Sequence, residues 1–259
     1  MKILVMIKQV PDTATQVKIG SDPTAIDTAG ITWIVSPYDE YALEEALRIK
    51  EKRGQGDVVA VTLGPERAKE ALRSCLAMGA DRAIHLNDPT WEKADTLLTA
   101  RALAAVIKQE QPALALFGRQ AIDDDMGAMS AAVAELLGWP CASWIMEESV
   151  DEAGKTIRVG RQIEGGLEIF DLPLPAALAA QKGLNEPRYP TLKGIMGAKK
   201  KEIKDVKAAD LGLSAEAPVL SVVKLEALPA RPPGRIIPGE VADAAKELVR
   251  ALREDAKAI

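Results

Sequence analysis

The stretch Asp57-Val58-Val59-Ala60-Val61-Thr62-Leu63-Gly64-Pro65 decides the fold. Its apolar run over residues 57–63 is nearly continuous and does not alternate with polar residues, which is typical of a strand covered by helices on both faces. Gly64-Pro65 then begins a helical stretch that Gly79 closes. A buried strand followed directly by a helix predicts a parallel sheet of the α/β class.

The same alternation of strand and helix extends over residues 1 to about 140. Further short apolar runs predict three more parallel strands, at residues 4–10, 82–86 and 113–117. Helical periodicity is strong over residues 95–110 and returns over residues 126–137, where Gly138 ends it. The polar residues 11–32 predict a long connection or irregular hairpin.

Another helix is predicted to begin at Ser36-Pro37-Tyr38-Asp39. The Ser36 hydroxyl can cap this helix, Pro37 suits its first position, and Asp39 can accept from free N–H groups of the first turn. Behind them, apolar residues recur at helical spacing as far as Gly54.

The pattern changes after Pro140. Residues 143–150, 156–163 and 166–172 predict antiparallel strands, and residues 176–181 predict one more buried strand. From Leu184 the chain is rich in proline and lysine and has too little apolar material for a core, so we expect it to wrap a partner subunit. It ends in an amphipathic helix at 239–259. The expected organisation is an α/β domain over residues 1–183 and an arm over residues 184–259.

Composition excludes several classes of function. Lys and Arg total 33 against 38 Asp and Glu, a net charge of −5, so the basic footprint of a nucleic-acid-binding protein is missing. His85 is the only histidine, and Cys75 and Cys141 stand far apart, so a catalytic triad, a zinc site and dithiol chemistry lack support. No apolar run approaches the ~20 residues that cross a bilayer, and no secretory signal begins the chain, which predicts a cytoplasmic protein without membrane insertion.

Four loops of the predicted sheet are candidates for a ligand site. Ligands of open parallel sheets bind beyond the carboxyl ends of the strands, here after Val10, Val35, Leu63 and Phe117. Three of these loops lead into helix N-termini, whose N–H groups suit a phosphate. The loop after Phe117 holds Asp123-Asp124-Asp125. These acids suit a solvated turn, a Mg²⁺ site or a nucleotide loop, and the residues alone leave all three open.

Several blocks of sequence stand in a familiar order. They are Ser36-Pro37-Tyr38-Asp39-Glu40, Ala77-Met78-Gly79-Ala80-Asp81-Arg82, Gln120-Ala121-Ile122-Asp123-Asp124-Asp125 and Glu164-Gly165-Gly166-Leu167-Glu168. The most specific is Leu184-Asn185-Glu186-Pro187-Arg188-Tyr189-Pro190-Thr191-Leu192, followed by Ile195-Met196 and Ala198-Lys199-Lys200-Lys201. With these blocks the chain resembles the beta subunit of electron transfer flavoproteins over nearly its whole length.

The resemblance implies a fold, a partner and two nucleotides. The fold would be a parallel, Rossmann-like, adenine-nucleotide-binding sheet flanked by helices, with antiparallel additions and an extended C-terminal arm. The protein would be an electron carrier subunit, not an enzyme acting alone, paired with an alpha subunit that holds most of the FAD. A structural AMP would lie in this subunit against Met6, Ser36, Pro37, Tyr38, Asp39, Leu63, Arg119, Gln120, Ala121, Ile122, Asp123, Asp125, Met126, Gly127, Ala128, Met129 and Ser130. Tyr38 matches an aromatic position near the dimethylbenzene edge of the flavin.

Residues 189–196 match the family's recognition loop, and we call them the docking segment. The resemblance implies that Thr191, Leu192, Ile195 and Met196 contact acyl-CoA and related flavin dehydrogenases. Electrons would pass from them toward a membrane-bound quinone reductase, the electron transfer flavoprotein–quinone oxidoreductase, in fatty acid oxidation. Leu192 would be the anchor, and burying one aliphatic side chain contributes about 1.5–3 kcal/mol. The alternative is that Leu192 packs on its own subunit.

Some residues depart from the family pattern. Gly127-Ala128-Met129-Ser130 replaces the usual Gln and Thr near the phosphate, so backbone N–H groups and Ser130 would have to substitute. Asp124 stands where electron-bifurcating members tend to have glycine, which favours AMP over a second FAD. Thr13 and Gln162 replace an aromatic and an acid that some relatives have near the flavin. The alternatives are a bifurcating subunit with FAD in place of AMP and a stand-alone adenine-nucleotide-binding enzyme of similar fold.

Overall fold

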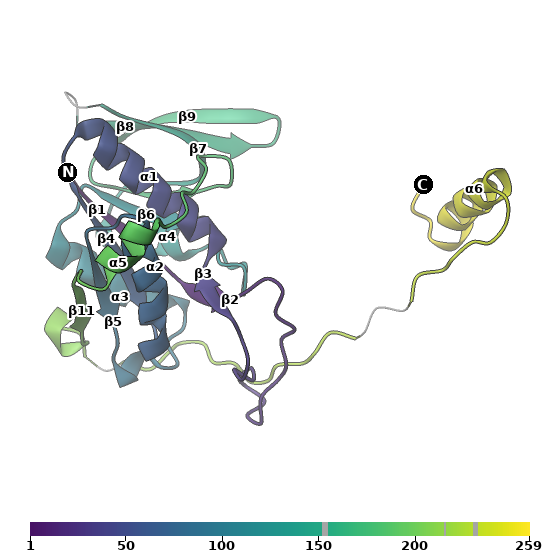
Figure 1. The fold of residues 1–259 in the computed structure, drawn as a ribbon, viewed down its shortest axis with the longest axis horizontal. Helices are drawn as coiled ribbons and strands as arrows, with labels where there is room; N and C mark the ends of the chain where they lie inside the picture. Colours follow the sequence, from purple (N-terminus) through teal and green to yellow (C-terminus); the bar gives the residue numbers. More distant parts are fainter. Residues whose placement is uncertain (152–154, 215, 230–232) are drawn as a thin grey trace.

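The computed structural model describes residues 1–151, 155–214, 216–229 and 233–259. Within these residues nine strands form one sheet, in the order β11-β5-β4-β1-β6-β10-β7-β8-β9 (Figure 1). The strands are β1 (Lys2–Met6), β4 (Asp57–Leu63), β5 (Arg82–Leu86), β6 (Leu114–Gly118), β7 (Cys141–Asp151), β8 (Thr156–Ile163), β9 (Gly166–Pro173), β10 (Ala176–Ala180) and β11 (Ile203–Val206). Two short strands, β2 (Gln9–Pro11) and β3 (Trp33–Val35), form a separate antiparallel ribbon.

The described residues form six α-helices, and all but the last cover the two faces of the sheet. They are α1 (Pro37–Arg53), α2 (Lys69–Met78), α3 (Thr96–Glu110), α4 (Met129–Leu137), α5 (Leu192–Ala198) and α6 (Val241–Arg250), with short turns η1 (Glu66–Ala68), η2 (Pro89–Trp91), η3 (Ala209–Leu211) and η4 (Ala251–Asp255). Residues of α1, α2 and α5 share one hydrophobic core, and residues of α3 and α4 share another. The α/β fold class and its helix-flanked, mostly parallel sheet are therefore as the sequence predicts.

Strand β4 shows why its apolar run is continuous. Val58 and Ala60 point into the core beneath α1 and α2, whereas Val59 and Val61 point into the core beneath α3 and α4. Because successive side chains of a strand face opposite ways, covering both faces requires an apolar residue at every position.

The strands after residue 140 extend one end of the sheet. Strands β7, β8 and β9 pair antiparallel, as predicted, and β10 inserts between β6 and β7 in parallel with both. At the opposite edge β11 pairs in parallel with β5. This strand lies in the proline- and lysine-rich region, where the sequence pattern predicts no strand. The division of the chain at residue 183 stays a prediction.

Several elements differ from the sequence prediction, and three of the differences lie beside the expected ligand site. Residues 4–10 form two strands, because β1 ends at Met6 and the chain leaves the sheet before β2 begins at Gln9. The strand ending at Val35 pairs with β2 and does not join the parallel sheet. Helix α4 begins at Met129, three residues later than predicted, because Asp125 and Gly127 have positive φ angles of 50° and 62°, which a right-handed helix excludes.

The strand order reverses beside β1. From β1 the chain adds β4 and then β5 on one side, and after α3 it returns to add β6 on the other side of β1. In open α/β sheets the two diverging connections leave a crevice at such a switch point. A ligand site is therefore expected at the carboxyl ends of β1 and β6.

The C-terminal helix is amphipathic, as predicted, and Figure 1 shows it apart from the sheet at the end of an extended segment. Its apolar side chains Val241, Leu248 and Val249 are exposed.

Candidate functional site

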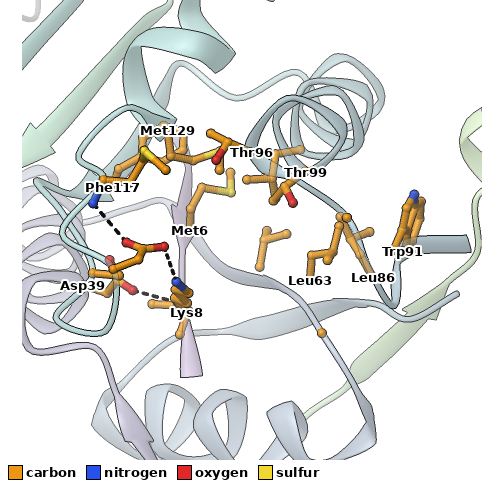
Figure 2. A pocket seen from close by; sticks show the side chains of 18 of the residues that line it. Met6, Lys8, Asp39, Leu63, Leu86, Trp91, Thr96, Thr99, Phe117 and Met129 are labelled. Atoms are coloured by element: carbon orange, nitrogen blue, oxygen red, sulfur yellow. Dashed lines mark hydrogen bonds and ion pairs between the residues drawn. The ribbon is translucent and has the colours of Figure 1, made fainter. Parts of the chain in front are cut away.

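A cavity of about 870 Å³ lies at the switch point (Figure 2). Met6, Leu63, Leu86 and Phe117 bring the carboxyl ends of β1, β4, β5 and β6 to its wall. In Figure 2 the charged side chains of Lys8 and Asp39 lie at one end, and Leu86 and Trp91 lie at the other. The cavity therefore has a charged end at Lys8 and Asp39, and at the other end the apolar side chains of Leu86 and Trp91 are accompanied by the polar residues Asn87, Asp88 and Glu92. Apolar side chains with a few polar groups suit a small molecule.

The side chain of Asp39, in the first turn of α1, hydrogen-bonds the segment after β1 and the end of β6. Its carboxylate accepts the backbone N–H of Lys8 at 2.7 Å and of Gly118 at 3.0 Å. Burial raises the pKa of Asp39 to about 7, although the two N–H groups favour the charged form. The predicted capping role is wrong, because Asp39 accepts from the strand ends and Ser36 makes no side-chain cap. The Ser36 hydroxyl is buried with no hydrogen-bond partner among the described residues.

Lys8 forms ion pairs with two of the three acids of the loop. Its ammonium lies 2.8 Å from a carboxylate oxygen of Asp123 and 2.8 Å from one of Asp124. Burial opposes this charge, yet the two ion pairs raise the pKa of Lys8 above its ordinary value. Asp125 instead accepts from the Gln120 amide at 2.6 Å. The acids are thus held by neighbours within the protein, which lowers the repulsion that an anion in the cavity would meet.

The N-terminus of α4 forms part of the cavity wall. Gly127, Ala128 and Met129 line the cavity, and no side chain caps the helix. The first N–H groups of a helix lack intrahelical partners, and together with the helix dipole they favour an anion. Ser130 is buried, and its side chain hydrogen-bonds Cys141.

The docking segment presents apolar side chains on a fixed base. Leu192 is 76 % exposed, and Ile195 and Met196 beside it are also exposed. Thr191 caps α5, since its hydroxyl accepts the Gly194 N–H at 3.0 Å.

The residues just before the docking segment attach it to α1. Arg188 donates to both carboxylate oxygens of Glu44, at 2.8 and 2.9 Å, and Asn185 donates to Glu45 at 2.7 Å. Glu44 and Glu45 are both buried, so these contacts are held inside the fold. The alternative that Leu192 packs on its own subunit does not hold in this structure.

Comparison with known proteins gives a consistent result. The family described as "Electron transfer flavoprotein domain" matches residues 24–211. Electron transfer flavoprotein subunit beta of Bos taurus is 40 % identical over 256 residues, covering 98 % of this chain and 97 % of its own length. The corresponding subunits of Homo sapiens and Bacillus subtilis are each 39 % identical, over 98 % and 100 % of this chain.

The chain belongs to the electron transfer flavoprotein family, among its beta subunits. The resemblance drawn from the sequence blocks is confirmed. Electron transport and a flavin-related context are properties of this family. The roles of individual residues rest on the geometry of this chain.

The structure brings many of the predicted nucleotide residues together. Those that line the cavity are Met6, Asp39, Leu63, Arg119, Gln120, Ala121, Met126, Gly127, Ala128 and Met129. Among the described residues, the cavity wall does not include the others, namely Ser36, Pro37, Tyr38, Ile122, Asp123, Asp125 and Ser130. Asp123 and Asp125 still act on the site through Lys8 and Gln120.

Sequence reasoning missed one end of the cavity. The residues missed in the cavity wall include Leu86, Trp91, Thr96, Thr99 and Leu103, from β5, η2 and α3, together with the polar residues Asn87, Asp88, Glu92 and Asp95. The signal was present, because the loop after Leu86 also follows the carboxyl end of a parallel strand. The loop after Val35 took its place in the prediction, although β3 lies outside the parallel sheet.

A second polar cluster lies at the β5–β11 edge. One ligand atom from each of Glu66, His85 and Asp205 lies within 4.8 Å of the others. The Lys69 ammonium already bridges Glu66 and Asp205, at 2.7 and 3.0 Å, and so supplies the positive charge that a metal ion would bring. The buried His85 ring contacts Asp205 at 3.0 Å and the Gly64 carbonyl at 2.9 Å. The cluster therefore reads as a structural link between β5 and β11.

None of the helices described in the structure has the length and apolar character required to span a membrane.

Proposed function

We propose that this cytoplasmic chain is the beta half of a heterodimeric electron carrier and holds one AMP in the cavity at the switch point. The observation that carries the proposal is the N-terminus of α4, which no side chain caps, in the wall of a cavity that is also lined by the apolar side chains of Leu86 and Trp91. The backbone N–H groups at residues 127–129 suit the phosphate, and the apolar side chains of Leu86 and Trp91 suit the adenine. The volume of about 870 Å³ lies within the range of small-molecule sites.

The roles of Lys8 and Ser130 follow from the same geometry. Lys8 would keep Asp123 and Asp124 from repelling the phosphate. Because the Ser130 side chain bonds Cys141, the proposal assigns the phosphate to the backbone N–H groups and not to this hydroxyl. No metal ion is needed for this mode of binding.

The partner in the proposal is an alpha subunit that carries most of the FAD. When bound there, FAD supplies the electron-transfer chemistry, and this chain supports the ring and binds partner proteins. The extended C-terminal segment and the exposed apolar side chains of α6 support a role in wrapping the alpha subunit. An amphipathic helix lying away from its own core leaves apolar area that a partner can cover.

The docking segment would receive acyl-CoA and related flavin dehydrogenases. Its exposed Leu192, Ile195 and Met196 resemble the aliphatic anchors of transient interfaces, and the contacts of Arg188 with Glu44 hold their base in place. The electrons would then pass to a membrane-bound quinone reductase, as fatty acid oxidation requires.

The deciding experiment is to co-express the chain with an alpha partner and count the nucleotides released from the purified complex. One FAD and one AMP per heterodimer would support the proposal. Two FAD molecules would indicate a bifurcating subunit instead. A colourless, solitary chain that releases pyrophosphate from ATP would indicate a stand-alone adenine-nucleotide enzyme.

A further inference from the structure

Another cavity, of about 580 Å³, lies between α1 and β7, at the chain that leads into the docking segment. Its wall is formed by Glu45, Arg48, Glu51 and Lys52 of α1, by Met146, Glu147 and Glu148 of β7, and by Leu184. The chain packs closely on β7 here, since a Cβ at Gly183 would lie 2.9 Å from the Met146 Cε. The cavity therefore adjoins the base from which the docking segment projects.

Asn185 is attached to α1 through its amide N–H groups. They donate to the Glu45 carboxylate at 2.7 Å and to the Tyr41 carbonyl at 2.9 Å. The Asn185 amide oxygen is buried and has no hydrogen-bond partner among the described residues. The position of Glu45 therefore determines how firmly Asn185, and the chain that follows it, is held on α1.

Glu148 contacts Glu45 from the side of β7 and hydrogen-bonds it. Ionised carboxylates only accept, so a hydrogen bond between two carboxyl groups requires a proton on one of them. The Glu148 Oε2 is buried and meets no donor in the described part of the chain, which makes a negative charge there costly. Burial and the charge of Glu45 raise the pKa of Glu148 to about 7, although Lys52 and Arg48 favour its charged form. Glu148 is thus the member of the pair that carries a proton below neutral pH.

The other charged groups of this cavity do not replace that proton. The Arg48 guanidinium lies 3.8 Å from the Glu45 carboxylate, which is longer than a hydrogen bond. Glu51 accepts from Arg188 at 2.5 Å, and the side chains of Lys52 and Glu147 are exposed. When Glu148 loses its proton, two carboxylates therefore face each other beside Asn185 with little to offset their repulsion.

We propose that Glu148 is a positioning residue for dehydrogenase docking, and that the proton it shares with Glu45 keeps Glu45 in place for Asn185. This inference rests on the proposed function, since it assigns a role in docking. Deprotonation would loosen the base of the docking segment and would not release it, because Arg188 also holds that base through Glu44. Docking should accordingly weaken as the pH rises through neutrality.

The test measures electron transfer from an acyl-CoA dehydrogenase to the purified heterodimer at pH 6 and pH 8. Glu148→Gln keeps a donor for Glu45 without a charge that titrates. The ratio of its kcat/KM to that of wild type, taken with the same dehydrogenase, removes the titration of the dehydrogenase itself. We expect this ratio to rise about three- to tenfold from pH 6 to pH 8, with little change in the ratio of kcat values. The matched control is Glu147→Gln, which removes an exposed acid of the same wall and should follow wild type at both pH values.

A second measurement counts the protons that each heterodimer releases when the pH is raised from 6 to 8. Glu148→Gln should release about one proton fewer than wild type. Equal counts would show that Glu148 holds no proton in this range and would overturn the inference. A lower count together with a constant kcat/KM ratio would overturn the positioning role. A wild-type heterodimer with one FAD and one AMP that accepts no electrons from the dehydrogenase at either pH would overturn the proposed docking, and this inference with it.

Discussion

Leu192→Ala is expected to slow electron acceptance from flavin dehydrogenases without changing the folded complex. The side chain is 76 % exposed, so about three quarters of its area remains to be buried by a partner. Full burial of a leucine contributes about 1.5–3 kcal/mol, and alanine retains a small part of it, which leaves a loss of about 1–2 kcal/mol. Because 1.4 kcal/mol is tenfold, docking should weaken about 5- to 30-fold.

The assay is steady-state reduction of the heterodimer by an acyl-CoA dehydrogenase, with the heterodimer as the varied substrate. We expect kcat/KM to fall by that factor while kcat at saturation changes little, since Leu192 lies away from the nucleotide cavity. Leu167→Ala, on an exposed leucine of β9, is the matched control. Equal kcat/KM for Leu192→Ala and wild type at equal FAD content would refute the anchoring role.

Three further substitutions test the framework around these surfaces. A Cβ at Gly194 would overlap the Ala77 carbonyl oxygen, so Gly194→Ala should displace α5 from α2 and weaken dehydrogenase docking. Gly197 has open space around it, so the control Gly197→Ala should leave docking unchanged. The kcat/KM for reduction by the dehydrogenase measures docking in both variants. A Cβ at Gly118 would lie 2.8 Å from the Asp39 backbone N, so Gly118→Ala should lower the urea-unfolding free energy by about 1–3 kcal/mol. The pKa of Asp39 is raised to about 7, so its protonated form favours the folded state at low pH. The contribution of Asp39 to the free energy of unfolding should fall by about 2–3 kcal/mol between pH 5 and pH 8. Asp39→Asn should remove this pH dependence in urea titrations. Unchanged urea midpoints for Gly118→Ala, or identical pH profiles for wild type and Asp39→Asn, would contradict these expectations.

The elements that the sequence predicts well are those with a local cause. A continuous apolar run predicts strand β4, and Pro37 and Gly54 predict the start and the end of α1. Each signal lies within the element that it specifies, so no knowledge of distant residues is needed.

The elements that the sequence misses depend on distant partners. The four residues of β11, Ile203-Lys204-Asp205-Val206, lie in a proline- and lysine-rich region and are too few to show a strand pattern of their own. Only pairing with β5, more than 100 residues earlier, makes them a strand. Asp39 reads as a helix-capping residue, but the N–H groups of Lys8 and Gly118 take both of its oxygens. The candidate site was found in part because strand-end loops follow a topological rule, and its end at Leu86 and Trp91 was missed because membership of the parallel sheet cannot be read from one strand alone.

The positions of the cavity and the docking segment suggest how one subunit can serve two kinds of partner. Asp39 joins the N-terminus of α1 to β1 and β6 at the cavity, and Glu44 and Glu45, one to two turns later in the same helix, hold Arg188 and Asn185 at the base of the docking segment. A helix is stiff over this distance, so nucleotide binding at one end fixes the frame from which Leu192 projects. Loss of the nucleotide should therefore loosen docking through α1 even though no docking residue contacts the cavity, and an AMP-depleted complex that still docks with wild-type kcat/KM would show that the two surfaces act independently.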